Sequence, residues 1–172
     1  MARLHPDGIL DPGKGGGRGR HAALIRMVAL GAILVVALFG WLGGGPSSKL
    51  AARSSQADFL IDAPTRLRNG NFFEMRLDVI ARAPVADAVL TVPEPLWRDV
   101  TINSMVPAAS EEEVVGGEFR FHFGPLAPGD RLQFKLDGQL NPPLFGATEG
   151  PIRLLDGEKE LARHAYRLTV LP

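Results

Sequence analysis

The stretch FFEMRLDVIARA, residues 72–83, alternates between apolar and polar side chains with a period of two. Successive side chains of an extended strand point to opposite faces, so this pattern predicts a strand with one face in a core and the other in solvent. The side chains expected in the core are Phe73, Met75, Leu77, Val79 and Ala81. Such one-sided patterning is typical of antiparallel sheets.

Two further stretches repeat the alternation, EFRFHFG at residues 118–124 and DRLQFKLDGQL at residues 130–140. Proline lacks the backbone N–H that a central strand needs, and proline-containing corners interrupt the chain at residues 93–95, 128–130 and 141–143. No stretch in this region has helical spacing. We therefore expect about seven to nine strands and no helix in the C-terminal part of the chain.

Two turn signals predict hairpins between these strands. Asn69-Gly70 suits a two-residue turn in which both central residues take a positive φ, and it predicts a hairpin of residues 65–68 onto residues 71–82. Asp156-Gly157 predicts a second hairpin between the apolar runs on either side of it.

Residues 57–172 have a normal size for one domain with a single core, and short strands separated by frequent turns predict an all-β fold, an immunoglobulin-like antiparallel β-sandwich. The segment FGPLAPGDRLQFKLDG, residues 123–138, resembles a segment of many bacterial Ig-like surface and repeat domains, in which an LAPG corner introduces an alternating strand. This resemblance implies the sandwich fold and no activity. The chain has no cysteine, so the core is expected to be held by packing alone.

An uncharged run extends from Met27 to Ser48 and is rich in Leu, Val, Ile and Ala as far as Leu42. A helix rises 1.5 Å per residue, so roughly 20 such residues cross the ~30 Å hydrocarbon core of a bilayer. The sequence therefore predicts one transmembrane helix over residues 22–43, with Arg26 reaching back to the lipid headgroups. The side chains expected to anchor the chain in the membrane are Arg26, Met27, Leu30, Ile33, Leu34, Val35, Val36, Leu38, Phe39, Trp41 and Leu42.

The charges on either side of this run predict its orientation, because Lys and Arg near a span stay on the cytoplasmic side more often than they cross. The cations before the run are Arg3, Lys14, Arg18, Arg20 and Arg26. Only Lys49 and Arg53 follow closely. We expect a single pass through the cytoplasmic (inner) membrane, with the N-terminus inside and the C-terminal domain periplasmic or extracellular.

The alternative to a retained anchor is a cleaved secretory signal, whose apolar core has about 7 to 15 residues and is followed by small residues. Here the apolar run is longer, and Pro46 follows the small residues Gly43 and Gly45, where proline generally blocks cleavage. A retained anchor is therefore favoured. A lipoprotein is excluded, because lipid attachment needs a cysteine.

The segments around the predicted helix have compositions that do not support a folded core. Residues 1–21 are basic and Gly-rich and are expected to form a disordered cytoplasmic tail. Residues 44–56 combine Gly, Ser and a few charges and are expected to form a flexible linker. The whole chain has 19 basic and 19 acidic side chains, so no overall charge favours a nucleic acid partner.

The sequence contains no G-x-S-x-G, H-E-x-x-H, paired-Cys or calcium-loop motif, so we expect no catalytic residue, no metal site and no cofactor. His122 shares the polar face of its strand with Glu118 and Arg120 and is expected to be solvated. His164 lies on an apolar face and is expected to be partly buried, with a carbonyl or hydroxyl accepting its N–H. The run 111–113, three glutamates, is expected to form a solvated loop that protects a strand edge.

Apolar side chains near proline-stiffened loops are the remaining candidates for a binding role. They are Trp97, Leu144 and Phe145. Apolar groups on rigid loops serve as recognition anchors, because little entropy is lost when they dock. The alternative is that they cover the end of the sandwich core, with Trp97 as a core plug.

Two functional hypotheses follow. The first is a non-enzymatic interaction or assembly module, held at the lipid bilayer by its helix and binding an envelope protein partner. The second is an envelope ligand-binding or hydrolytic domain acting on sugars or peptides, which requires carboxylates such as Glu74, Asp78 or Asp99 to converge in one cleft.

Overall fold

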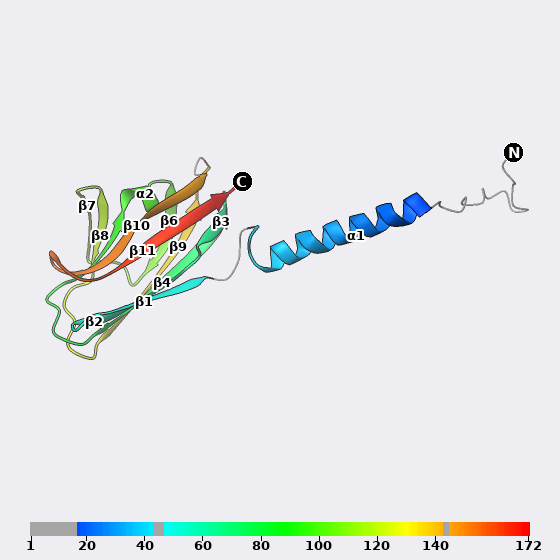
Figure 1. The fold of residues 1–172 in the computed structure, drawn as a ribbon. Helices are drawn as coiled ribbons and strands as arrows, with labels where there is room; N and C mark the ends of the chain where they lie inside the picture. The colour runs from blue at the N-terminus through cyan, green and yellow to red at the C-terminus, as the bar shows by residue number, and fades with distance from the viewer. Residues whose placement is uncertain (1–16, 43–46, 143–144) are drawn as a thin grey trace, which may run out of the picture. The chain divides into compact units, whose positions relative to one another are not determined.

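The computed structural model describes residues 17–42, 47–142 and 145–172, and the chain divides into two compact units, Met1–Phe39 and Gly40–Pro172. In the first unit the described residues form helix α1 (Gly17–Leu38) (Figure 1). Large apolar side chains are exposed along α1. Its segment His21–Leu38 is long and apolar enough to cross a membrane.

The bounds of α1 correct the sequence prediction at both ends. Residues 17–21, expected in a disordered tail, belong to the helix. Phe39, Trp41 and Leu42, expected within a span over residues 22–43, follow the helix in a turn. The helix stops because Gly40 takes a positive φ of 70°, the left-handed conformation that commonly ends helices and that glycine adopts without strain.

The second unit is a β-sandwich of two sheets that lie face to face (Figure 1). One sheet has five strands in the order β1-β2-β4-β9-β6, and all its neighbouring strands are antiparallel. Its strands are β1 (Ser48–Arg53), β2 (Ala57–Ala63), β4 (Phe72–Ala81), β9 (Arg131–Leu140) and β6 (Val100–Val106).

The other sheet has six strands in the order β3-β11-β10-β5-β8-β7, and only its β3–β11 pair is parallel. Its strands are β3 (Arg66–Arg68), β11 (Lys159–Leu171), β10 (Gly146–Asp156), β5 (Ala88–Pro93), β8 (Glu118–His122) and β7 (Glu111–Val115). A single helical turn, α2 (Glu94–Trp97), follows β5. The predicted all-β, immunoglobulin-like sandwich is therefore confirmed.

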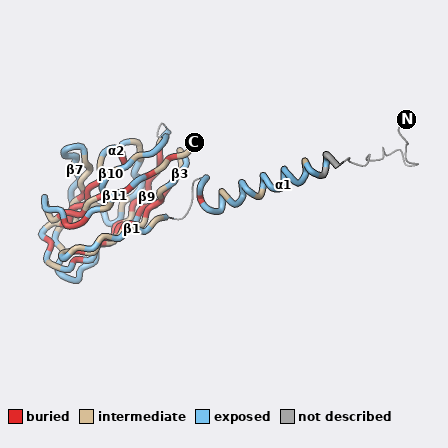
Figure 2. Tube along the Cα trace, viewed as in Figure 1, coloured by how far each residue is buried: buried red, intermediate tan, exposed pale blue. Residues whose placement is uncertain are grey.

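The core lies between the two sheets, where buried residues gather (Figure 2). The apolar face predicted for residues 72–83 is buried. Residues 72–81 form β4, which lies at the centre of its sheet, with β2 on one side and β9 on the other. The exposed fractions of its five predicted core residues are all 9% or less. Facing residues of the other sheet, such as Leu90, Phe121 and Ile152, complete the core.

The sandwich begins earlier than predicted. Residues 48–53 were expected inside a flexible linker over residues 44–56. They form β1, and every residue of β1 pairs with a residue of β2. Leu50 and Ala52 point inward and pack on the core, while Lys49, Ala51 and Arg53 face outward. Ser54 closes the turn to β2, since its Oγ accepts a hydrogen bond from the backbone N–H of Ala57 at 3.0 Å.

The predicted hairpin at Asn69-Gly70 is wrong, although the turn itself forms. Gly70 has a positive φ of 78°, and the backbone N–H of Asn71 donates to the carbonyl of Arg68 at 3.1 Å. The strands on either side of the turn belong to different sheets. Leu67 of β3 is buried and pairs with Val170 of β11, whereas β4 pairs with β2 in the other sheet. The second predicted hairpin, β10–β11 around Asp156-Gly157, is confirmed.

The structure also has more strands than the predicted seven to nine and a helical turn where none was expected. The described residues form eleven strands. The additional ones include β1, the three-residue β3, and β7, which replaces the loop expected over residues 111–113. Pro95 lies in the first turn of α2, where proline is favoured, so the helical turn forms at the predicted corner.

Candidate functional site

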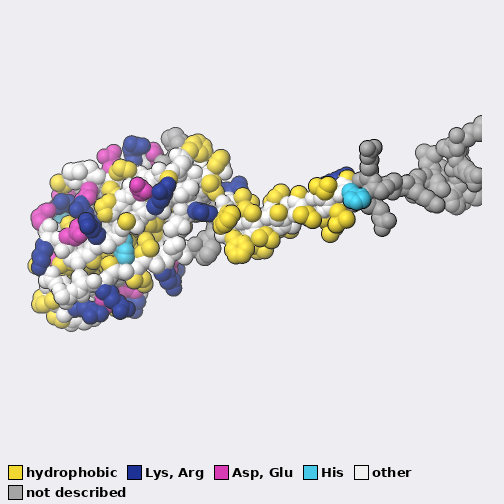
Figure 3. Space-filling model, viewed as in Figure 1, with side chains coloured by type: hydrophobic (Ala, Val, Ile, Leu, Met, Phe, Trp, Pro, Cys, Tyr) yellow, Lys and Arg dark blue, Asp and Glu magenta, His cyan; other side chains and the backbone are white. Residues whose placement is uncertain are grey.

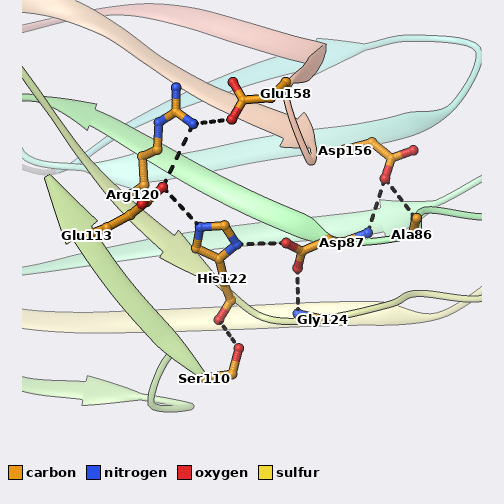
Figure 4. Close-up of polar contacts among 9 residues, drawn as sticks. All are labelled: Ala86, Asp87, Ser110, Glu113, Arg120, His122, Gly124, Asp156 and Glu158. Atoms are coloured by element: carbon orange, nitrogen blue, oxygen red, sulfur yellow. Dashed lines mark hydrogen bonds and ion pairs between the residues drawn. The ribbon is translucent and has the colours of Figure 1, made fainter. Parts of the chain in front are cut away.

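A cluster of charged side chains covers part of the outer face of the six-stranded sheet (Figure 4). Strand β8 supplies its centre, because alternation sends its phenylalanines into the core and its polar residues outward. We call this set the charge cluster; its members are Asp87, Glu113, Arg120, His122 and Glu158.

His122 lies between two carboxylates. Its Nδ1 is 2.7 Å from Oδ2 of Asp87, and its Nε2 is 3.5 Å from Oε1 of Glu113. The second oxygen of Asp87 accepts the backbone N–H of Gly124 at 3.1 Å, which fixes the carboxylate beside the ring. The hydrogen bond to Asp87 raises the pKa of His122, against the opposing effect of burial, and favours an imidazolium that donates to both carboxylates.

This arrangement corrects the expectation that His122 is solvated. Its side chain is only 20% exposed and is ion-paired. The local pattern could not show this, since Asp87 is 35 residues away in the sequence. The turn that carries Asp87 is itself fixed, because Oδ1 of Asp156 accepts the backbone N–H groups of Ala86 at 2.7 Å and Asp87 at 3.1 Å.

Arg120 continues the charge cluster along the same strand. Its Nη1 is 2.6 Å from Oε1 of Glu158 and 3.8 Å from Oε1 of Glu113, and its side chain is 15% exposed. The hydrogen bond with Glu158 raises the pKa of Arg120 above its ordinary value. The neighbouring pair of Arg153 and Glu118 extends these contacts toward β10.

The members of the charge cluster are paired with one another. Both ring nitrogens of His122 face carboxylates. Ser110, the nearby hydroxyl in Figure 4, donates to the backbone carbonyl of His122 and not to its ring. Within the described parts of the chain no group of three or more His, Cys, Asp or Glu side chains is arranged to hold a metal ion. The geometry therefore supports a structural role, in which the cluster joins β7, β8 and the loops beside them.

His164 confirms its prediction. It is partly buried, and its Nε2 lies 3.4 Å from the carbonyl of Phe59, an atom that only accepts hydrogen bonds. The ring also packs on that of Phe59 with 5.7 Å between centroids. It therefore links β11 to β2 across the interior.

The carboxylates proposed for a hydrolytic cleft do not converge. Glu74 is paired with Lys135 at 2.7 Å, Asp78 with Arg131, and Asp99 lies 3.6 Å from a neighbouring arginine. The hydrogen bond from Arg131 lowers the pKa of Asp78, and the hydrogen bond from Lys135 lowers the pKa of Glu74. A general acid needs a raised pKa, so the lowered pKa values of Asp78 and Glu74 do not suit either carboxylate to that role.

The three predicted binding residues do not form one exposed site. Trp97 lies in α2 with an exposed fraction of 4%, and its ring packs on those of Phe121 and Phe119, with centroids 5.4 Å and 6.2 Å apart. Of the two alternatives for Trp97, the structure shows the core plug. Phe145 precedes β10 and is 60% exposed, and Leu144 lies outside the described residues.

A second exposed apolar surface was missed by the sequence reasoning. Each sheet ends in a strand, β6 or β7, that no other strand pairs with on its outer side among the described residues, and β7 follows β6 directly in the chain. Aliphatic side chains on these strands are 38–62% exposed. We call these two edge strands together the β6/β7 edge; their exposed aliphatic residues are Ile102, Val106, Val114 and Val115. Nothing in the local sequence marks it, because burial there depends on which strand ends each sheet.

Comparisons with known proteins show no family for this chain. No protein-family model and no curated protein matches the chain. Among solved structures it is similar to a non-cellulosomal cohesin from the hyperthermophilic archaeon Archaeoglobus fulgidus, with a TM-score of 0.38 and 11% sequence identity. That similarity covers 74% of this chain and 93% of the cohesin chain.

Proposed function

We propose that this protein is a non-catalytic interaction domain held at a membrane by α1, and that it binds a partner protein of the cell envelope through the β6/β7 edge. The observation that carries the proposal is the exposure of four aliphatic side chains on two unpaired edge strands. An open strand edge offers unpaired N–H and C=O groups to another chain, and exposed aliphatic groups beside it add apolar contact area.

The anchoring part of the proposal rests on α1 and its flanking charges. The helix is 22 residues long, and its large apolar side chains face outward, as in a membrane-spanning segment. The excess of Lys and Arg before the uncharged run that starts at Met27, most of it within the first turns of α1, favours an N-terminus on the cytoplasmic side. In this topology the sandwich lies in the periplasm or outside the cell, as an interaction partner for other envelope proteins.

Site-specific photo-crosslinking in intact cells tests the interaction. A photoreactive residue in place of Val106 or Val114 is expected to give an adduct of the same mass at both positions. The same residue at Ser55, an exposed turn position between β1 and β2, is expected to give none.

A charge substitution supplies the matched control. Val114→Lys on the edge is expected to abolish the adduct formed from Val106. Ile80→Lys is expected to leave it intact, since Ile80 is 40% exposed but lies on the outer face of the five-stranded sheet. An adduct that forms equally from Ser55, or that survives Val114→Lys, contradicts this use of the edge.

A further inference from the structure

A hollow beside the short strand β3 has properties that the interaction proposal does not use. Strand β3 pairs only with the last three residues of β11 and leaves the preceding part of that edge uncovered. The opening beside it has a volume of about 500 Å³. We call it the β3/β11 hollow; the residues that line it include Leu50, Thr65, Arg66, Ala165, Arg167 and Thr169.

The surface around the hollow is rich in arginine. Arg66 and Arg68 are exposed on β3, and Arg163 and Arg167 follow the outer side of β11. In the view of Figure 3, cationic side chains lie along β11 and beside β3. Among the described residues neither Arg66 nor Arg68 has a carboxylate partner. Nε of Arg68 donates to a backbone carbonyl, which leaves its two Nη groups for an external anion.

The carboxylate nearest to these arginines forms only a weak ion pair. Glu149 lies 3.4 Å from Arg167, and both side chains are more than two-thirds exposed. Such exposed pairs contribute little and exchange readily with other partners, because water and salt screen them. A guanidinium binds a phosphate or carboxylate through two parallel hydrogen bonds, so the charge of this surface favours a ligand with that geometry.

The segment that follows α1 contacts the same strand. The carbonyl of Leu42 accepts a hydrogen bond from Nε of Arg68 at 2.6 Å, and the guanidinium of Arg66 lies 6.0 Å from the ring centroid of Trp41. Trp41 is 62% exposed, as expected for a tryptophan at a membrane interface. Only three residues separate Leu42 from Leu38, the last residue of α1.

We propose that the β3/β11 hollow binds the phosphate of an anionic phospholipid headgroup, with Arg66 and Arg68 as its principal contacts. This inference rests on the proposed membrane anchorage. Leu50 supplies an apolar wall, suited to the first methylenes of the acyl chains that a phospholipid has and a free phosphate ion lacks. The exposed Phe145 lies at the same end of the sandwich, since it directly precedes the pairing of Gly146 with Val170 and so stands beside the end of β11.

The test uses the full chain in lipid nanodiscs made of phosphatidylcholine, with or without phosphatidylglycerol. The protein has no cysteine, so Phe145→Cys gives a unique site for a fluorophore, and Ser55→Cys gives a distant reference site. A nitroxide on the lipid headgroups quenches a fluorophore that lies close to them. Quenching at position 145 is expected to rise when phosphatidylglycerol is present and to fall again at high salt, while position 55 stays unquenched.

Two matched double variants test whether the response to phosphatidylglycerol depends on the arginines of the hollow. In Arg66→Gln/Arg68→Gln the response to phosphatidylglycerol is expected to disappear, with lipid affinity about fivefold weaker for each arginine removed. Arg76→Gln/Arg98→Gln removes two arginines that are 65% and 66% exposed elsewhere and is expected to keep it.

Three results overturn the proposal. They are equal quenching in both lipid compositions, an equal loss in both double variants, and reproduction of the response in phosphatidylcholine nanodiscs by inorganic phosphate alone. A chain that fails to co-elute with the nanodiscs contradicts the membrane anchorage instead, and a chain that co-elutes without responding to phosphatidylglycerol refutes only the lipid site.

Discussion

Replacement of Trp97 by alanine tests whether α2 closes the core. The indole is 4% exposed and packs against two phenylalanine rings of β8. Truncation of a buried tryptophan removes its burial energy and leaves a cavity, so Trp97→Ala is expected to cost about 3–5 kcal/mol of the free energy of unfolding. That is a large part of the roughly 5–15 kcal/mol that holds a typical domain together. For a domain of this size about 4 °C of melting temperature corresponds to 1 kcal/mol, so we expect Tm to fall by about 12–20 °C.

The assay is thermal and urea unfolding of the full chain in detergent micelles, followed by the circular dichroism of the strands. Phe145→Ala serves as the control, because Phe145 is 60% exposed and its truncation is expected to change stability by no more than about 0.5 kcal/mol. If Trp97→Ala is as stable as Phe145→Ala, then Trp97 is not a core residue and the packing of α2 described above is wrong.

Three further predictions use the same unfolding assay. The pKa of His122 is raised above its ordinary 6.5, mainly by its hydrogen bond to Asp87, so the stability from this pair is fully present below about pH 6.5 and is lost as pH rises through the raised pKa. His122→Gln is expected to remove this pH dependence between about pH 5 and pH 9, and an unchanged profile would show that the ring does not titrate there. Gly150→Ala places a Cβ against the ring of Pro93, which ends β5, and is expected to cost about 1–3 kcal/mol, whereas wild-type stability would show that this contact relaxes freely. Tyr166→Phe removes the hydroxyl that donates to the buried carbonyl of Pro64 and is expected to cost about 1–3 kcal/mol; a neutral effect would mean that the carbonyl finds another donor.

The strands that the sequence predicts well are those whose burial follows a local period. Strand β4 alternates over its whole length and lies at the centre of its sheet, so its pattern and its burial agree. The β10–β11 hairpin was also predictable, because the turn at Asp156-Gly157 joins two strands that are direct neighbours. In both cases the information lies within about a dozen residues.

Features that depend on distant residues were not predictable in this way. The turn at Asn69-Gly70 forms as expected, but its signal carries no information about which sheet receives the next strand. Strand β1 has a weak pattern and is ordered by its pairing with β2. The site shows the same limit, because His122 is ion-paired with a carboxylate from a loop distant in the sequence, and the exposure of the β6/β7 edge follows from strand order.

Cysteine accessibility measures the central claim, that α1 holds the sandwich at the outer face of a membrane. The native chain has no cysteine, so Ser55→Cys and Ala2→Cys each give a single reporter, on the sandwich and in the N-terminal segment. In intact cells a membrane-impermeant maleimide is expected to label Ser55→Cys and to leave Ala2→Cys unlabelled until the membrane is opened, with both proteins retained in the membrane fraction after alkaline carbonate extraction. Release of the chain by carbonate, or labelling of Ala2→Cys in place of Ser55→Cys, would contradict the claim.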